Sequence, residues 1–523
     1  MNIRFSRPVL LILAILLVLL LPAGCGGTSS VDEEESFLGN SEAPMANSEH
    51  KTLSFYFPGA QPKSWPEVKA KIEEEISDTI NVSLDFKWIE IQSYLQKMNA
   101  LEATDEQIDA FILGKPDKVF LDFTKLARNG SLKDITQLFN ANAPGLKQQY
   151  TQEELSYGQV DGKLYALPSL YPHAYATYLM VDEALMKKYN ISDITTYEKY
   201  EEYLKAVKAN EPDLIPGIIA NLPDTLELFA RGSGYVIVDG LQRLVYKWDD
   251  PEMKVLAWEN TSEFKEAIYY LADWFKKGYL SSNQDQSKVT SFIFYGDLNP
   301  PTTETTKLTY NTSATDFKET NPLRMFYLYP DRKVQRDNPM GSFFFNGSFV
   351  FPSSSVNTER ALQFVNWVQQ NRDNYYLMMY GIEGKDYVTD PTYGYPGFPK
   401  GMDYNNRTYM YWDGNWAFNN IGYEPIPKDK EGNALDGRKQ FLDKNSKYPP
   451  HGALYPDYQK IQATADNRTR RFNEFENRIR QGQLSDTSEV DSFIKELEGF
   501  GTDNLVAEVQ KQLDEAVQAR KQQ

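Results

Sequence analysis

The stretch TLSFYFPG, residues 52–59, is an apolar run that ends in a turn, and the fold of the chain follows from it. Apolar side chains then recur every four residues from Val68 to Ile80, which predicts an amphipathic helix. The stretch VSLDFKW, residues 82–88, alternates strictly and predicts a strand, and IDAFIL, residues 108–113, is apolar enough for a central strand. This alternation of strands and helices indicates a parallel sheet covered by helices on both faces.

Helical patterns dominate the later chain, most clearly at residues 197–210, 261–277 and 357–370. A buried strand, GSFVFP, precedes the last of these, and Thr502 is expected to cap a final helix. Because 523 residues exceed the roughly 250–300 at which a single core stops growing, we expect two or more lobes.

The charge of the chain bears on its partners. The formal net charge is −18, with 73 acidic against 55 basic residues. Such a surface repels phosphate backbones and anionic lipid headgroups, so no nucleic-acid partner is expected.

The first 24 residues have the pattern of a secretory signal peptide. Arg4 and Arg7 give a positive start, and an apolar run of 13 residues follows from Val9 to Leu21. This run is shorter than the roughly 20 residues that a membrane-spanning helix needs. We therefore predict a signal peptide over residues 1–24, with an uncleaved anchor helix as the alternative.

Cys25 is the only cysteine of the chain, so no disulfide can form within it. Residues 21–25, LPAGC, resemble a bacterial lipobox, in which the cysteine is diacylated and becomes the new N-terminus. This resemblance implies a protein anchored by its lipid on the extracytoplasmic face of the cell membrane. Each buried acyl methylene contributes about 0.8 kcal/mol to anchoring. Residues 25–50 are then expected to form a flexible tether.

Metal, cofactor and nucleophile motifs are not found in the sequence. The three histidines, His50, His173 and His451, have no metal-ligand spacing, and there is neither a phosphate-binding glycine loop nor a GxSxG elbow. We therefore expect no metal and no cofactor. Paired carboxylates cannot be recognised from spacing, so a surface glycoside hydrolase or lyase that uses two of them stays open as the alternative to a non-enzyme.

Aromatic residues are concentrated in segments without periodicity. The densest are YPHAYATY at 171–178 and YMYWDGNWAFNN at 409–420. In loops, aromatic faces can stack on the apolar faces of a pyranose ring, while neighbouring amides and carboxylates bond its hydroxyls. The alternative is that these rings simply pack beneath long loops.

Several longer stretches resemble one family along most of residues 52–520. These stretches are YFPGAQPKSWPEV at 56–68, VDGKLYALPS at 160–169, NGSFVFPSSSVNTERALQFVNWV at 346–368, YGIEGKDY at 380–387 and the tail from Phe493 to Val517. The chain resembles the bacterial extracellular solute-binding lipoproteins of ABC importers, in the group with a C-terminal DUF3502 domain.

The resemblance implies an α/β fold of two lobes, like the type II periplasmic binding proteins. Each lobe would hold a mostly parallel sheet flanked by helices, with crossing segments between the lobes and an added helical C-terminal region. Lobe 1 would comprise residues 52–165 and about 325–375, and lobe 2 residues 166–324 and about 376–523. The DUF3502-like region would begin near residue 380.

The resemblance also implies a function. A carbohydrate, often an oligosaccharide, would bind in the cleft between the lobes of a monomer, and the permease of an ABC transporter would read the closed form. No catalysis is required. A sensor or adhesin that presents a bound glycan without transport is a further alternative.

Ligand contacts are carried over from the resemblance to particular positions of this chain. His173 could accept a hydrogen bond from a sugar hydroxyl or donate one to it, although it could equally be a satisfied hinge histidine. The predicted ligand-binding residues are Gln61, Trp65, Tyr94, Tyr171, His173, Tyr175, Arg231, Trp412, Asn415 and Trp416.

Overall fold

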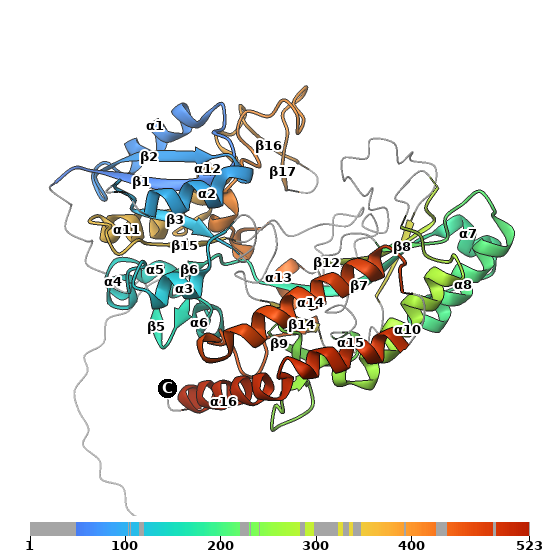
Figure 1. Ribbon diagram of the computed structural model, residues 1–523. Helices are drawn as coiled ribbons and strands as arrows, with labels where there is room; N and C mark the ends of the chain where they lie inside the picture. Colours follow the sequence, from blue (N-terminus) through green and yellow to red (C-terminus); the bar gives the residue numbers. More distant parts are fainter. Residues whose placement is uncertain are drawn as a thin grey trace, which may run out of the picture. The chain divides into compact units, whose positions relative to one another are not determined.

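The computed structural model describes residues 49–521 apart from the gaps given below (Figure 1). The signal peptide, Cys25, most of the tether and Arg231 lie outside the described residues, as do the side chains of His173 and Tyr175. The gaps within the described range are residues 103, 105, 115–119, 220–229, 231, 240, 283–287, 298–322, 328–333, 338–346, 392–393, 425–436 and 485–487.

The N-terminal stretch builds the first sheet, as its pattern predicts. Within the described residues this sheet has five strands in the order β2-β1-β3-β15-β6. Strand β1 pairs in parallel with β2 and β3, and β15 lies antiparallel between β3 and β6. The bounds are β1 Lys51–Pro58, β2 Val82–Ile89, β3 Ala110–Leu113, β6 Ala166–Pro168 and β15 Ser348–Val350.

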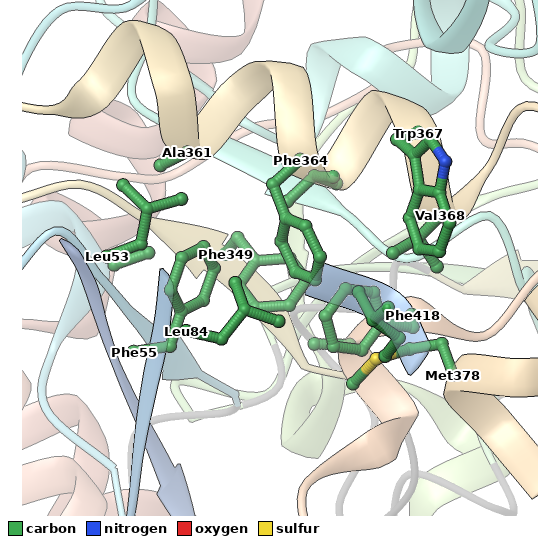
Figure 2. Packing of buried hydrophobic residues seen from close by; sticks show 14 of the residues in the cluster. Leu53, Phe55, Leu84, Phe349, Ala361, Phe364, Trp367, Val368, Met378 and Phe418 are labelled. Atoms are coloured by element: carbon green, nitrogen blue, oxygen red, sulfur yellow. The ribbon is translucent and has the colours of Figure 1, made fainter. Parts of the chain in front are cut away.

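Helices cover both faces of this sheet. On one face, α1 (Trp65–Ile76) and α11 (Thr358–Val368) bury their apolar sides against a cluster of rings. Figure 2 shows Phe55, Phe349, Phe364 and Phe418 from this cluster. On the other face lie α2 (Ile91–Glu102) and α3 (Phe123–Arg128). Shorter elements follow: α4 Thr136–Asn142, α5 Pro144–Lys147, α6 Gln152–Ser156, β4 Gln159–Val160 and β5 Lys163–Leu164.

A second core forms around the long strand β7 (His173–Asp182). Strand β7 pairs antiparallel with β12, β13 and β14, while β8 and β18 join their neighbours in parallel. The fold class is as expected, and this second sheet is mixed rather than mostly parallel. Its other elements are α7 Glu183–Lys188, α8 Tyr197–Asn210, β8 Ile218–Ile219, α10 Ser262–Lys276, β12 Ser291–Asp297, β13 Leu323–Tyr327, β14 Val334–Asp337 and β18 Ser446–Lys447.

The C-terminal helices pack on a small antiparallel sheet and on the second core. Leu505 and Val509 of the last helix share a cluster with Val236 and Leu244 of that sheet. The last helix begins at Thr502, so the predicted start is confirmed to within one residue, but Thr502 is the first helical residue rather than the cap, and its hydroxyl donates to the carbonyl of Leu497. The elements are β9 Tyr235–Asp239, β10 Leu244–Lys247, β11 Leu256–Ala257, η1 Trp258–Asn260, η6 Gln459–Ile461, α14 Gln462–Arg480, α15 Ser488–Gly499 and α16 Thr502–Lys521.

The chain stays with the first core for longer than the expected boundary near residue 375. Tyr375, Met378, Tyr409 and Phe418 are buried in the same cluster as β1, so the segment up to about residue 423 completes the first core. Its assignment to the second lobe is therefore corrected. The elements of this segment and the next are α12 Arg372–Tyr380, β16 Val388–Thr389, β17 Pro396–Gly397, η4 Asn415–Phe418, η5 Ile421–Tyr423 and α13 Arg438–Asn445.

A buried ion pair fixes α14 to the rest of the chain. Arg468 donates to Glu259 at 2.6 Å, and the two side chains are 0% and 1% exposed. The same guanidinium also donates to the hydroxyl of Thr502 and to the carbonyl of Gln242. Removing one partner of such a pair leaves a buried charge without compensation.

Glu259→Ala should lower the free energy of unfolding by about 3–5 kcal/mol, because Arg468 would stay buried without its carboxylate. Urea denaturation measures this loss. Asp491→Ala is the control, because it breaks the exposed pair with Lys265 and should cost less than about 1 kcal/mol. Equal losses in the two variants would contradict this view of the pair.

Candidate functional site

The strand ends of the first sheet meet at one edge. Strands β1, β3 and β6 run in the same direction and end at Pro58, Leu113 and Pro168, while β15 begins there at Ser348. Ser348 pairs with both Leu113 and Pro168. In open α/β sheets, ligands bind beyond the carboxyl ends of the strands. The residues just beyond these ends are Gly59, Gly114, Ser169 and Gly347.

A segment from the C-terminal half of the chain, residues 412–418, sits directly on this edge. Gly59 has φ +115°, and a Cβ added to it would lie 2.0 Å from the Cβ of Asp413. A Cβ on Gly347 would lie 2.4 Å from Cγ2 of Ile112 and 3.0 Å from Nε1 of Trp416. Only glycine permits these close approaches, so two glycines at strand ends seat the segment, which we call the edge loop.

The edge loop brings three types of side chain to the strand ends. Asp413, Asn415 and Trp416 are each partly buried there and partly exposed. A carboxylate, an amide and an indole ring offer two kinds of hydrogen-bonding group and one stacking surface. Asn415 and Trp416 were among the predicted ligand residues, whereas Asp413 was not. The signal for Asp413 was its place before Gly414 within the aromatic run, since Gly414 has φ +94° and turns the chain there.

Two buried hydroxyls lie at the same edge. The Oγ atoms of Ser169 and Ser348 make no hydrogen bond within the described part of the chain, and the residues are 4% and 0% exposed. Most buried hydroxyls are bonded, since leaving one without a partner costs free energy. Ser348 follows Gly347, against which Trp416 packs, so one of these two hydroxyls lies next to the edge loop.

Three aromatic residues predicted to contact ligand are buried against the first sheet: Trp65 and Trp412 in the first core, and Tyr94 in the cluster beneath α2 on the other face. Trp65 stacks on Phe86 with ring centroids 4.5 Å apart, and Trp412 donates its indole N–H to the carbonyl of Met378 at 3.2 Å. The hydroxyl of Tyr94 donates to the carbonyl of Ile112 at 3.0 Å. Trp65, Tyr94 and Trp412 are at most 4% exposed, which leaves their rings no free face for a ligand.

Burial also sets the protonation of the one tyrosine among them, Tyr94. It raises the pKa of the Tyr94 hydroxyl far above its usual range, although the hydrogen bond to Ile112 opposes this rise. Tyr94 therefore stays a neutral donor at any physiological pH.

The remaining predicted residues lie at the edge or at the crossing to the second core. Gln61 is exposed two residues beyond Gly59. Tyr171, which precedes β7, donates to the Glu424 carboxylate at 2.5 Å, and the Arg438 guanidinium lies 4.7 Å from the centre of its ring. Tyr171 therefore holds a crossing segment in place. The backbones of His173 and Tyr175 lie in β7, opposite Asp337 and Asp297.

The described residues hold neither a cluster of three or more His, Cys, Asp or Glu that could bind a metal, nor a helix long and apolar enough to span a membrane.

Solved structures share this architecture. An N-glycan transport solute binding protein (NgtS) from Streptococcus pneumoniae aligns with a TM-score of 0.69 and 19% identity, over 90% of this chain and 100% of its own. The chain has the fold of ABC-transporter solute-binding proteins. That NgtS protein has also been crystallised with Man1GlcNAc and with Man5GlcNAc. An HMO-binding solute-binding protein from Bifidobacterium longum infantis aligns with a TM-score of 0.60 and 14% identity, over 89% of this chain and 99% of its own.

Sequence comparisons agree with the solute-binding-protein fold. A relative from Streptococcus pneumoniae, named a carbohydrate ABC transporter substrate-binding protein, is 22% identical over 489 residues, which cover 92% of this chain and 94% of the relative. Residues 454–518 match DUF3502, described as a domain of unknown function. The DUF3502 domain is therefore present, and it covers α14–α16 rather than the whole region from residue 380.

Trp412→Ala should lower the free energy of unfolding of this solute-binding-protein fold by about 3–5 kcal/mol, because it removes a buried indole from the first core. Trp416→Ala is the matched variant, four residues away on a partly buried ring, and should cost clearly less. Urea denaturation of both proteins measures the difference. A Trp416 loss equal to that of Trp412 would contradict the division between core ring and edge ring.

Proposed function

We propose that the chain is an extracytoplasmic solute-binding protein that captures an oligosaccharide at the edge loop and delivers it to an ABC permease. The observation that carries this proposal is the edge loop itself, which places Asp413, Asn415 and Trp416 at the carboxyl ends of the strands. The solute-binding-protein fold and a relative named for carbohydrate transport support it.

The edge loop has the chemistry that a sugar requires. A pyranose ring presents an apolar C–H face, on which the exposed part of Trp416 can stack. The Asp413 carboxylate can accept hydrogen bonds from two adjacent hydroxyls, and hydrogen bonds to a charged acceptor are the stronger kind. Asn415 and Gln61 can both donate and accept. The apolar face and the hydroxyl rim of a pyranose therefore match the Trp416 indole and the polar side chains around it.

Delivery to a permease depends on closure. In this proposal, a sugar held by the edge loop also touches groups of the second core, and this additional contact stabilises the closed form. Tyr171, His173 and Tyr175, which lie at the crossing, are the proposed contacts there, and Arg231 is a further one. The protein acts as a monomer and carries out no covalent chemistry.

Trp416→Ala should weaken oligosaccharide binding by about 1–3 kcal/mol through the loss of aromatic burial. A soluble form, residues 26–523, is screened by thermal shift against mono- and oligosaccharides, and the best ligand is titrated by calorimetry. A ligand at 100 times its dissociation constant adds about 2.7 kcal/mol to stability. Trp248→Ala is the control, because it removes a partly buried indole from the small sheet cluster.

Full affinity in the Trp416 variant would move the site away from the edge loop. Incubation of the wild-type protein with the same glycans tests the enzyme alternative, and release of cleaved products at a useful rate would overturn the transport proposal. Unimpaired uptake of the sugar in a deletion strain would favour a sensor or adhesin instead.

We also propose that Cys25 carries the membrane anchor, on the strength of the lipobox-like sequence before it. Cys25→Ser should move the protein from the membrane fraction to the medium or leave its signal peptide uncleaved, since the thiol that accepts the lipid is lost. Fractionation followed by mass spectrometry of the N-terminal peptide measures both outcomes. A Cys25→Ser protein that is still acylated would contradict the assignment.

A further inference from the structure

Exposed aromatic residues gather in one segment of the chain. Among the described residues, six large apolar side chains are well exposed, and four of them lie within residues 388–411. This segment contains the hairpin β16–β17, drawn in orange near α12 in Figure 1. Grouped exposed apolar side chains mark a place of interaction. The four are Val388 (38%), Tyr395 (38%), Tyr404 (58%) and Tyr411 (48%).

Tyr411 is held in an unusual conformation. Its φ is +59°, a region that bulky side chains avoid because of contact between Cβ and the backbone. Its neighbour Trp412 is buried in the first core, while Tyr411 itself remains about half exposed. The ring of Tyr411 meets that of Phe398 edge to face, with centroids 5.8 Å apart. With Tyr411 in this conformation, the ring of Trp412 points into the first core while the ring of Tyr411 stays at the surface.

The exposed rings are continuous with the candidate site. Tyr411 lies two residues before Asp413 of the edge loop. At the other end, burial raises the pKa of the Tyr395 hydroxyl, and the nearby carboxylate of Glu424 raises it further. Glu424 is the residue that accepts the hydrogen bond of Tyr171 at the crossing. The touching rings of Tyr411 and Phe398 thus adjoin the edge loop in the chain, and Tyr395, three residues before Phe398, lies near Glu424 of the crossing segment.

We propose that Tyr395, Phe398 and Tyr411 form an outer stacking platform that binds the further sugar units of an oligosaccharide whose inner unit occupies the edge loop. This inference rests on the proposed function and adds the determinant of ligand length. The platform favours long ligands, since each further sugar unit that reaches an exposed ring adds contact area.

The composition of the segment suits a neutral glycan. Residues 388–411 contain two aspartates, one lysine and one arginine, so their charges balance within a strongly acidic protein. The platform rings are two tyrosines and one phenylalanine, and tyrosine combines a stacking face with a hydroxyl that bonds sugar hydroxyls. A neutral oligosaccharide meets no repulsion there.

The test is calorimetric titration of the soluble form with the two-unit and six-unit members of gluco-, manno-, galacto- and N-acetylglucosamine oligosaccharide series. Tyr411→Gly removes the ring and suits φ +59°, so its melting temperature should be no lower than that of the wild type. We expect its affinity for the six-unit ligand to fall about tenfold and its affinity for the two-unit ligand to stay unchanged. Tyr411→Phe should retain both affinities.

Tyr404→Ala is the matched control. Tyr404 is more exposed than Tyr411, but its ring is covered by the Arg407 guanidinium, 3.9 Å from the ring centre. Its removal should leave both affinities unchanged. A Tyr404 loss equal to that of Tyr411 would overturn the platform as defined.

The remaining outcomes separate the two proposals. An unchanged six-unit affinity in Tyr411→Gly, or equal losses for both ligand lengths, overturns the platform and leaves sugar binding at the edge loop intact. Sugar affinities that stay unchanged while uptake through the transporter fails would assign the rings to a protein partner and overturn the platform as well. If the wild-type protein binds no member of any series, both the platform and the proposed function fall.

Discussion

The close approach of Asp413 to Gly59 is the constraint on which the candidate site depends. Because a Cβ at Gly59 would lie 2.0 Å from the Cβ of Asp413, the edge loop can rest on the end of β1 only while that position is glycine. Gly347 provides the same room at the start of β15, beneath Trp416. A segment more than 350 residues away along the chain thus supplies the polar and aromatic groups at the carboxyl edge of the first sheet. The parallel strands offer a place for a ligand, and the edge loop gives that place its chemistry.

The first core supports the edge loop, and the second core carries most of the DUF3502 helices. The first core buries α12 and the segment up to about residue 423 together with β1, and this burial anchors the edge loop from below through Trp412 and Phe418. The second core carries the DUF3502 helices, which are tied to it by the buried pair of Arg468 and Glu259. Desolvation of two buried charges can offset much of their mutual attraction, whereas removal of one partner leaves the other charge uncompensated. The DUF3502 helices thus pack on the second core and on the small sheet, while the groups proposed to bind sugar lie on the first core and at the crossing.

Much of the fold follows from periodicity. The spacing from Val68 to Ile80 and the alternation at residues 82–88 located α1 and β2, and Thr502 marked the start of the last helix. The candidate site could be predicted less completely from the sequence, because a tryptophan is equally suited to a hydrophobic core and to a sugar-binding site. Trp412 and Trp416 stand four residues apart in the same aromatic run, yet the first bonds to Met378 in the core and the second faces the strand end. Only long-range packing distinguishes them. The same packing places Asp413 against Gly59 at the end of β1, and no local sequence pattern predicts that contact.

Hydrogen–deuterium exchange of the soluble protein, with and without a saturating oligosaccharide, tests the central claim most directly. The claim is that the sugar binds where the edge loop covers the strand ends. If it is correct, bound ligand will slow exchange in peptides covering residues 412–418 and in the peptide that follows β1 at residues 59–61. Protection confined to other parts of the chain, with the edge loop exchanging at its free rate, would contradict it.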